Sequence, residues 1–231
     1  MSLLHSVVFV LVSYLFGALP IGLLVGRMVK GIDVRDYGSG NIGASNVWRT
    51  MGPLWGVAVF LFDFCKGYFP THLAGRVHDV SLWLPILAGL AAILGHNFSP
   101  FLRFKGGKGV ATSLGVVYGL SPLAAAVGFA VWGLCLLITR YISISSMIAA
   151  VVTSLVLIGF NRDLPHVLFA LLVAFFVLIK HRPNMARLKA GTEPKVGRPK
   201  ATPEVKTPEV KTPEVKTPEV KTPAEGTAPD E

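Results

Sequence analysis

The sequence is poor in charged residues and in cysteine. Only 15% of its 231 residues are charged, whereas a soluble domain of this length usually carries about a quarter. The two cysteines, Cys65 and Cys135, lie in apolar runs without a CxxC pair or a cysteine–histidine cluster, which excludes a disulfide framework and a structural zinc site. The low charge and the 52% share of hydrophobic residues indicate an integral membrane protein.

Several catalytic motifs are also missing. There is no GxSxG nucleophile elbow and no HxxxxD acyltransferase motif. The glycine-rich stretch around Lys108 is not a P-loop, because Gly109 stands where GxxxxGK[ST] requires Ser or Thr. Apart from Asp33, Asp36 and Glu193, the polar loops hold no carboxylates, which argues against two-metal phosphoryl transfer. We expect neither a metal nor a cofactor.

The basic residues point to membrane or anionic partners. The formal charge is +9, from 22 Lys and Arg against 13 Asp and Glu, and the cations cluster at the ends of apolar segments. Anionic headgroups, the positive-inside bias or an anionic substrate explain this pattern. The sequence has no basic surface interleaved with aromatic residues, so we expect no nucleic-acid partner.

Apolar runs predict an all-α membrane protein with seven transmembrane helices. The expected segments are Leu3–Val29, Leu54–Leu73, Ser81–Leu94, Val110–Leu120, Pro122–Ile138, Ile142–Phe160 and Leu164–Ile179. The first is a retained helix, since no basic region precedes it as in a signal peptide. Merging the short fourth segment with the fifth would leave six. Seven crossings, with the N-terminus outside and the C-terminus cytoplasmic, place every basic cluster in the cytoplasm.

The C-terminal residues differ from the rest. TPEVK occurs four times between Thr202 and Lys221. Proline in every fifth position prevents a helix, and one valine per repeat cannot build a core. We therefore divide the chain into a membrane domain, residues 1–193, and a disordered cytoplasmic tail, residues 194–231.

The first polar loop, DYGSGNIGASNVWRT, runs from Asp36 to Thr50. Its glycines allow backbone N–H groups to turn inward and form an anion nest, and Arg49 can form a bidentate pair with phosphate. An ordinary flexible turn needs fewer such residues. The candidate substrate-binding residues here are Gly38, Gly40, Asn41 and Asn46.

The second loop, GHNFSPFLRFKGGKGVAT, begins at Gly95. Gly106 and Gly107, flanked by Lys105 and Lys108, offer unhindered N–H donors beside two ammonium groups. A helix expected to begin near Gly109 would add its N-terminal dipole. A positive-inside anchor explains the lysines but neither the glycines nor His96. His96, Lys105, Gly106 and Gly107 are therefore candidates for substrate binding, and Lys108 is a candidate catalytic residue.

The third cluster is KHRPNMARLKAGTE, from Lys180 to Glu193. His181, Arg182, Asn184 and Arg187 can bind oxyanions, and Glu193 could orient a cation. Alone, this stretch is typical of a stop-transfer flank; its significance comes from lying on the same predicted side as the other loops.

Two groups inside the apolar segments are also candidates. Asp63 and Lys66 share one helical face, and a structural ion pair is favoured over a proton relay. Ser143 and Ser146 lie on one face with Arg140 and could reach a ligand held by the loops.

The stretches GSGNIGASNVWRT, GHNFSPFLRFKGGKGVATSLG and KHRPNMARLKAGTE, in this order and spacing, closely resemble the three signature motifs of the bacterial acyl-phosphate:glycerol-3-phosphate acyltransferase family. The resemblance covers roughly residues 3–193. Ser45 stands where many members carry Thr and keeps the hydroxyl. The TPEVK tail lies outside the family pattern.

The resemblance implies a multi-pass enzyme of the bacterial inner membrane with a cytoplasmic active site. It would transfer an acyl group from acyl phosphate to the sn-1 hydroxyl of glycerol 3-phosphate, releasing lysophosphatidate and phosphate. The acyl chain would lie in an apolar groove open to membrane lipid, and we expect a functional monomer. The implied polar ligands are Ser39, Arg49, Lys108, His181 and Asn184. Glu193 would be essential for activity or site assembly, and Gly106 and Gly107 would shape the glycerol 3-phosphate pocket.

A transporter or channel for a phosphorylated metabolite is the competing interpretation. Transporters usually contain internal repeats and polar sites at the membrane midplane. This sequence has no convincing repeat, and its polar groups crowd one side.

Overall fold

The computed structural model describes residues 2–77, 82–160 and 163–197. Regular structure in these ranges is entirely helical, which confirms the all-α prediction. The α-helices are α1 (Leu3–Ala18), α2 (Ile21–Lys30), α3 (Ala44–Met51), α4 (Pro53–Gly75), α5 (Trp83–Asn97), α6 (Val110–Leu120), α7 (Pro122–Thr139), α8 (Ile142–Phe160), α9 (Leu164–Lys180) and α10 (Arg182–Lys189). Of two 3-10 turns, η1 (Val34–Asp36) leads into the first polar loop and η2 (Pro100–Leu102) lies in the second. Most of the expected tail lies outside the described residues.

Four of the described helical stretches are long and apolar enough to cross a membrane: Leu3–Lys30, Trp83–Leu102, Pro122–Thr139 and Ile142–Phe160. The pair α9 and α10, bent by 48°, makes a fifth if it is taken as one span. These five candidate spans include neither α4 nor the 11-residue α6. The protein is therefore a multi-pass membrane protein, while seven crossings and the orientation stay predictions.

Proline positions explain where several helices begin and end. Pro20 separates α1 from α2, because its ring disfavours helical geometry at the preceding residue. Pro53, Pro122 and Pro165 occupy the first turns of α4, α7 and α9, where a missing N–H costs nothing.

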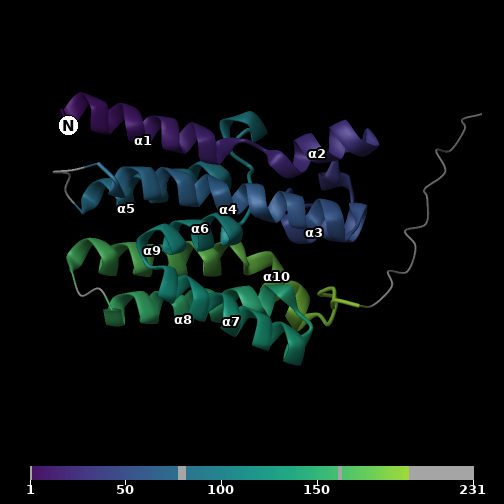
Figure 1. The fold of residues 1–231 in the computed structure, drawn as a ribbon. Coiled ribbons are helices and arrows are strands. Elements are labelled where there is room, and N and C mark those ends of the chain that lie inside the picture. Colours follow the sequence, from purple (N-terminus) through teal and green to yellow (C-terminus); the bar gives the residue numbers. More distant parts are fainter. Residues whose placement is uncertain (1, 78–81, 161–162, 198–231) are drawn as a thin grey trace, which may run out of the picture. The chain divides into compact units, whose positions relative to one another are not determined.

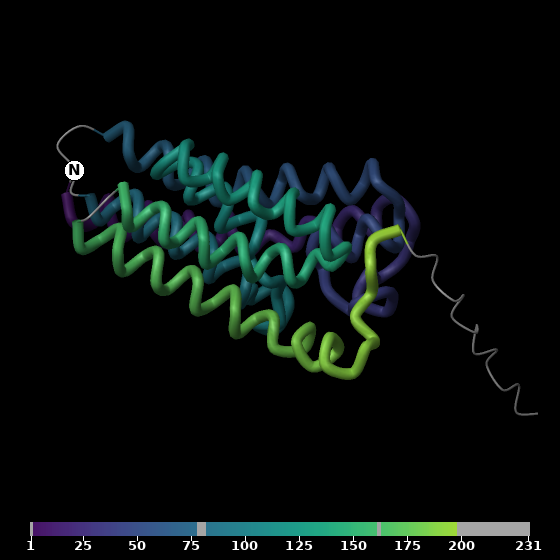
Figure 2. The backbone as a smooth tube through the Cα atoms, turned by 90° about the horizontal axis from the view of Figure 1, so that it is seen from below, coloured from purple at the N-terminus to yellow at the C-terminus, as the bar shows by residue number. Residues whose placement is uncertain are grey.

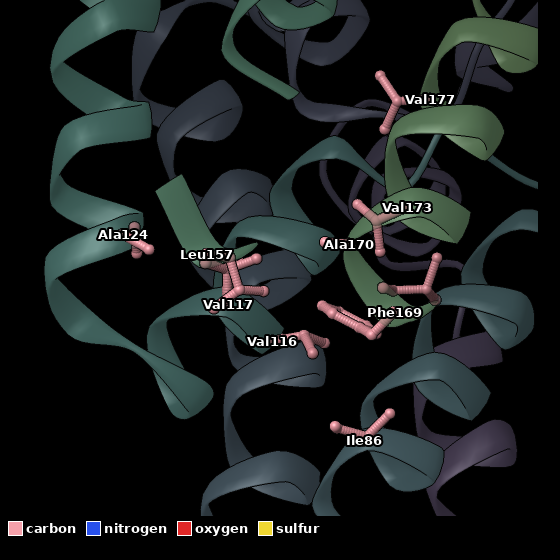
Figure 3. Packing of buried hydrophobic residues seen from close by; sticks show 11 residues of the cluster. Ile86, Val116, Val117, Ala124, Leu157, Phe169, Ala170, Val173 and Val177 are labelled. Atoms are coloured by element: carbon pink, nitrogen blue, oxygen red, sulfur yellow. The ribbon is translucent and has the colours of Figure 1, made fainter. Parts of the chain in front are cut away.

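A buried apolar cluster connects α5 with the helices that follow the second loop. Figure 3 shows side chains of α5, α6, α7, α8 and α9 directed toward one another. Phe169, Ile93 and Leu157, each at most 1% exposed, are among its largest members. Helices α4 and α6 approach especially closely, since a Cβ at Gly67 or Gly115 would overlap the partner helix's backbone. This packing fixes the N-terminus of α6 against α4 and α5.

The ion pair predicted between Asp63 and Lys66 is present inside the bundle. Their side chains, 4% and 2% exposed, are joined by an Oδ1–Nζ contact of 2.7 Å. Lys66 also donates to the carbonyl of Leu19 over 2.5 Å, at the break between α1 and α2. The pair therefore ties α4 to a helix break, as a structural ion pair should.

Helices α2, α3 and α10 gather at one end of the bundle, away from the N-terminus (Figures 1 and 2). The first and third polar stretches, which are more than a hundred residues apart in the sequence, are thus brought to the same end.

We predict that Lys66→Met destabilises the protein by about 3–5 kcal/mol, because it leaves the carboxylate of Asp63 buried without its cation. The control is Asp63→Asn combined with Lys66→Met, which removes both charges and should recover most of the loss. Denaturant unfolding in detergent micelles measures both. A single variant as stable as the wild type would contradict the buried pair.

Candidate active site

The first loop is organised by Asn46, which is fully buried. Its Oδ1 accepts from the backbone N–H and the hydroxyl of Ser39, over 2.7 and 3.1 Å. Its Nδ2 donates to the carbonyls of Val34 and Tyr37, over 2.7 and 3.1 Å. Gly38 has a φ of 66° and a Cβ there would overlap Asn46 Oδ1. Asn46 therefore shapes the loop that presents Ser39, and its direct contact with a substrate stays a prediction.

The rest of this loop leads into α3. Asn41 Oδ1 accepts from the N–H of Gly43 over 2.9 Å, an Asx turn that precedes the helix. Gly40 has a φ of 70°, which glycine adopts without strain. Arg49 lies on α3, one turn after Asn46, and is partly buried.

The second loop folds back along the end of α5. The N–H of Gly106 donates to the carbonyl of Asn97 over 3.2 Å, and that of Gly107 donates to His96 over 3.0 Å. These two N–H groups are therefore not free donors for an anion, and that part of the prediction is wrong. The reason is that the last carbonyls of α5 need donors of their own.

His96 lies behind this loop. It is 4% exposed, and a Cβ at Gly107 would overlap its imidazole. Its Nδ1 is 3.6 Å from Asp63 Oδ1. The imidazole of His96 thus packs directly against Gly107, and its contact with a substrate stays a prediction. The expectation that a helix begins near Gly109 is confirmed, since α6 starts at Val110.

A chain of short hydrogen bonds joins the second loop to the third cluster. Lys108 Nζ donates to Asn184 Oδ1 over 2.6 Å. Asn184 Nδ2 donates to Glu193 Oε1 over 2.6 Å, and Arg187 Nε donates to Glu193 Oε2 over 2.7 Å. The side chains of Asn184 and Glu193 are buried. We call Lys108, Asn184, Glu193 and Arg187 the polar chain.

The charges of all three loops act on one another. Burial lowers the pKa of Lys108 to about 8; Glu193 opposes this effect, while Arg187 and Arg49 add to it. Burial also lowers the pKa of Arg49, again opposed by Glu193 and supported by Arg187. Because such effects need proximity, Arg49 from the first loop shares one environment with the polar chain.

Glu193 is ionised in this environment. Burial alone would raise its pKa, but the hydrogen bonds from Asn184 and Arg187, the nearby hydroxyl of Ser143 and the charge of Arg187 outweigh burial and lower the pKa overall. The Ser143 hydroxyl contributes although it forms no hydrogen bond of good geometry. One carboxylate thus faces three cations, and the excess positive charge favours an anionic ligand.

His181 ends α9 and is 3% exposed. Its Nδ1 lies 2.7 Å from the carbonyl of Val177. Because a carbonyl only accepts, this partner assigns the proton to Nδ1 in the neutral ring and leaves the Nε2 lone pair available. The charges of Lys108 and Glu193 act on this imidazole, which places it beside the polar chain.

Three other predicted residues have different surroundings. Ser146 accepts a hydrogen bond of 3.3 Å from the indole of Trp132, so it joins α7 to α8. Lys105 and Arg182 are exposed, and none of the hydrogen bonds or ion pairs among the described residues connects them to the polar chain. Their contact with a substrate stays a prediction.

Asn97 is a residue that the sequence reasoning overlooked. It is 0% exposed and neither atom of its amide has a partner among the described residues. The amide lies against Gly109, at the start of α6. The sequence signal for Asn97 was its position in the GHNF stretch, but no rule on the spacing of residues marks this asparagine as part of a site. Among the described residues no group of three or more His, Cys, Asp or Glu could hold a metal ion.

Comparison with known proteins identifies the family. A sequence model described as "Glycerol-3-phosphate acyltransferase" matches residues 7–191. The glycerol-3-phosphate acyltransferase of Gloeobacter violaceus is 46% identical over 82% of this chain and 94% of its own length. That of Desulforudis audaxviator is 48% identical, over 84% and 96%.

Solved structures agree with these matches. The glycerol 3-phosphate form of PlsY, an integral membrane glycerol 3-phosphate acyltransferase, superposes with a TM-score of 0.80 at 38% identity, covering 84% of this chain and 96% of PlsY. Its lysophosphatidic acid form gives a TM-score of 0.78 at 37% identity, with the same coverage. The chain with these three converging loops belongs to the glycerol-3-phosphate acyltransferase family.

Proposed function

We propose that this protein transfers a fatty acyl group from acyl phosphate to the sn-1 hydroxyl of glycerol 3-phosphate, giving lysophosphatidate and inorganic phosphate. The observation that carries the proposal is the meeting of Arg49, Lys108 and Arg187 around the single carboxylate of Glu193. Both proposed substrates bear a phosphate group. The glycerol 3-phosphate and lysophosphatidic acid forms of the related PlsY support the same acceptor and product.

The cations hold the two phosphoryl groups and orient the reactants. An acyl phosphate is already activated, since its leaving group is phosphate, so positioning and charge stabilisation are sufficient. Arg49 and Lys108 bind phosphate oxygens, with the second N–H of Asn184 Nδ2 as a further donor. The Ser39 hydroxyl joins them when it turns away from Asn46. Glu193 is already bound by Asn184 and Arg187. Its role is therefore to hold these residues in place.

Two groups can accept the proton of the attacking hydroxyl. One is His181 Nε2, since Nδ1 is engaged with Val177. The other is a phosphate oxygen of a substrate, which would explain why, among the described residues, no free carboxylate lies beside the cations. Either route delivers the proton without a metal.

The acyl chain has a matching apolar surface. A groove between α8 and α9 is lined by Met147, Ile148, Val151, Val152 and Leu178. Met147 lies one turn from Ser143, and Leu178 one turn from His181. A chain lying in this groove would bring its carboxyl end to the polar chain.

The membrane arrangement we propose has seven crossings, the N-terminus outside and the active site at the cytoplasmic face of the bacterial inner membrane. The positive-inside distribution of the basic loops supports this orientation. The acyltransferase domain, predicted from the sequence as residues 1–193, extends through residues 194–197, which contact the α7–α8 corner. It works as a monomer, and the TPEVK repeats have no catalytic part.

We expect purified protein in lipid to release phosphate from palmitoyl phosphate when glycerol 3-phosphate is added, with lysophosphatidate identified by mass spectrometry. Lys108→Ala should lower this rate by about 100-fold or more, since it removes a charge-assisted contact in a buried site. No phosphate release, together with uptake of glycerol 3-phosphate into proteoliposomes, would contradict the enzyme and favour a transporter.

The activity should also depend on pH through Lys108. Its pKa of about 8 means that the ammonium form is lost as pH rises through that value. A phosphate dianion binds more tightly when Lys108 carries its proton. Above pH 8 the share of protein with charged Lys108 falls about tenfold per pH unit, and kcat/KM should fall with it. Lys108→Arg stays charged and should remove this limb, whatever its absolute rate. A wild-type profile that is flat from about pH 7 to pH 10 would contradict the assignment.

A further inference from the structure

The residues that follow Glu193 form contacts that the family signature does not explain. The family match ends at residue 191, and the sequence predicts a tail from residue 194. In the structure, however, the N–H of Val196 donates to the carbonyl of Arg140 over 2.8 Å. Lys195 Nζ lies 5.0 Å from the centre of the Tyr141 ring. These contacts join the C-terminal segment to the corner between α7 and α8.

Helix α10 is held to the second loop by the bond from Lys108 to Asn184, but its own residues form no hydrogen bond or ion pair with α7 or α8 in the described part of the chain. It has eight residues, of which only Asn184 is buried, and it follows a bend of 48° after α9. At its end the chain reverses through Gly191, whose φ is 69°. The N–H groups of Thr192 and Glu193 both donate to the carbonyl of Arg187. These bonds fix Glu193 relative to α10, but they do not fix α10 relative to α7 and α8.

The corner between α7 and α8 is shaped to receive the segment. Arg140 ends α7 with a φ of 60°, a left-handed conformation that is uncommon for residues other than glycine. Its carbonyl accepts the N–H of Val196. Ser143, which helps to lower the pKa of Glu193, lies in the first turn of α8, three residues further on.

We propose that Lys195 and Val196 form a strap that positions Glu193, and through it Asn184 and Lys108, for the reaction. This inference rests on the proposed acyl transfer. The strap anchors Glu193 and α10 to the α7–α8 corner, so the carboxylate stays beside Ser143 and Asn184 stays within reach of Lys108. Lys195 and Val196 touch no reacting atom; they are positioning residues.

The decisive variant is Val196→Pro in the full chain, because proline removes the N–H that Arg140 accepts. Val196→Ala is the matched control, since it keeps the N–H and shortens an exposed side chain. We expect kcat/KM with palmitoyl phosphate and glycerol 3-phosphate to fall about tenfold in Val196→Pro, and to stay within about twofold in Val196→Ala.

A second pair of variants tests the strap without changing its backbone. Tyr141→Leu removes the ring beneath Lys195, whereas Tyr141→Phe keeps it. We expect a loss of kcat/KM of about twofold to fivefold in Tyr141→Leu and none in Tyr141→Phe.

A readout independent of activity separates positioning from general damage. An amine reagent at pH 7 should label Lys108 several times faster in Val196→Pro than in Val196→Ala. The reason is that, without the strap, Asn184 is no longer held in place to accept the hydrogen bond from Lys108. Lys66, 2% exposed inside the bundle, is the internal reference, and its labelling should not change. Peptide mass spectrometry measures both lysines in one sample.

The outcomes distinguish the two proposals. If the wild type releases no phosphate, the proposed function fails. The strap is then tested by the labelling of Lys108 in Val196→Pro and Val196→Ala alone. If the wild type is active, but Val196→Pro matches Val196→Ala in rate and in Lys108 labelling, the strap is overturned. If Val196→Pro increased the labelling rates of Lys66 and Lys108 equally, the whole helix bundle would have loosened, and this result would also overturn the strap.

Discussion

The site depends on the buried chain of hydrogen bonds from Lys108 through Asn184 to Glu193 and Arg187. A lone ammonium group in this position would be costly, because burial already lowers the pKa of Lys108 to about 8. Glu193 offsets part of this cost, and Arg187 keeps Glu193 ionised and in place. Since each member needs its neighbour, the chain fixes loops that are distant in the sequence.

The rest of the fold serves this arrangement. The Asp63–Lys66 pair and the close approach of α4 and α6 set the start of α6, and Lys108 stands just before it. His96 and Asn97 hold the two glycines against the end of α5. The apolar helices thus provide a rigid frame, and the polar loops at one end carry the chemistry.

Much of this could be predicted from the sequence. Apolar runs predicted the long helices, although not α3 or α10. The glycine-rich loops with Arg49 and Lys108 indicated an anion site, because these signals are local. Partners set by tertiary contact were not visible. The N–H groups of Gly106 and Gly107 serve carbonyls of α5, and Ser146 serves Trp132. The strap at Lys195 and Val196 was assigned to the tail, since its composition is polar and only contact with Arg140 reveals its place.

The most direct test of the convergence is the pKa of Lys108, measured from the pH dependence of its labelling in three proteins. The wild type should titrate at about 8. Glu193→Gln, which keeps the shape and removes the charge, should lower this pKa, and Arg49→Gln should raise it, because each charge acts on Lys108 from a different loop. A pKa unchanged by both substitutions would show that the three loops do not share one site.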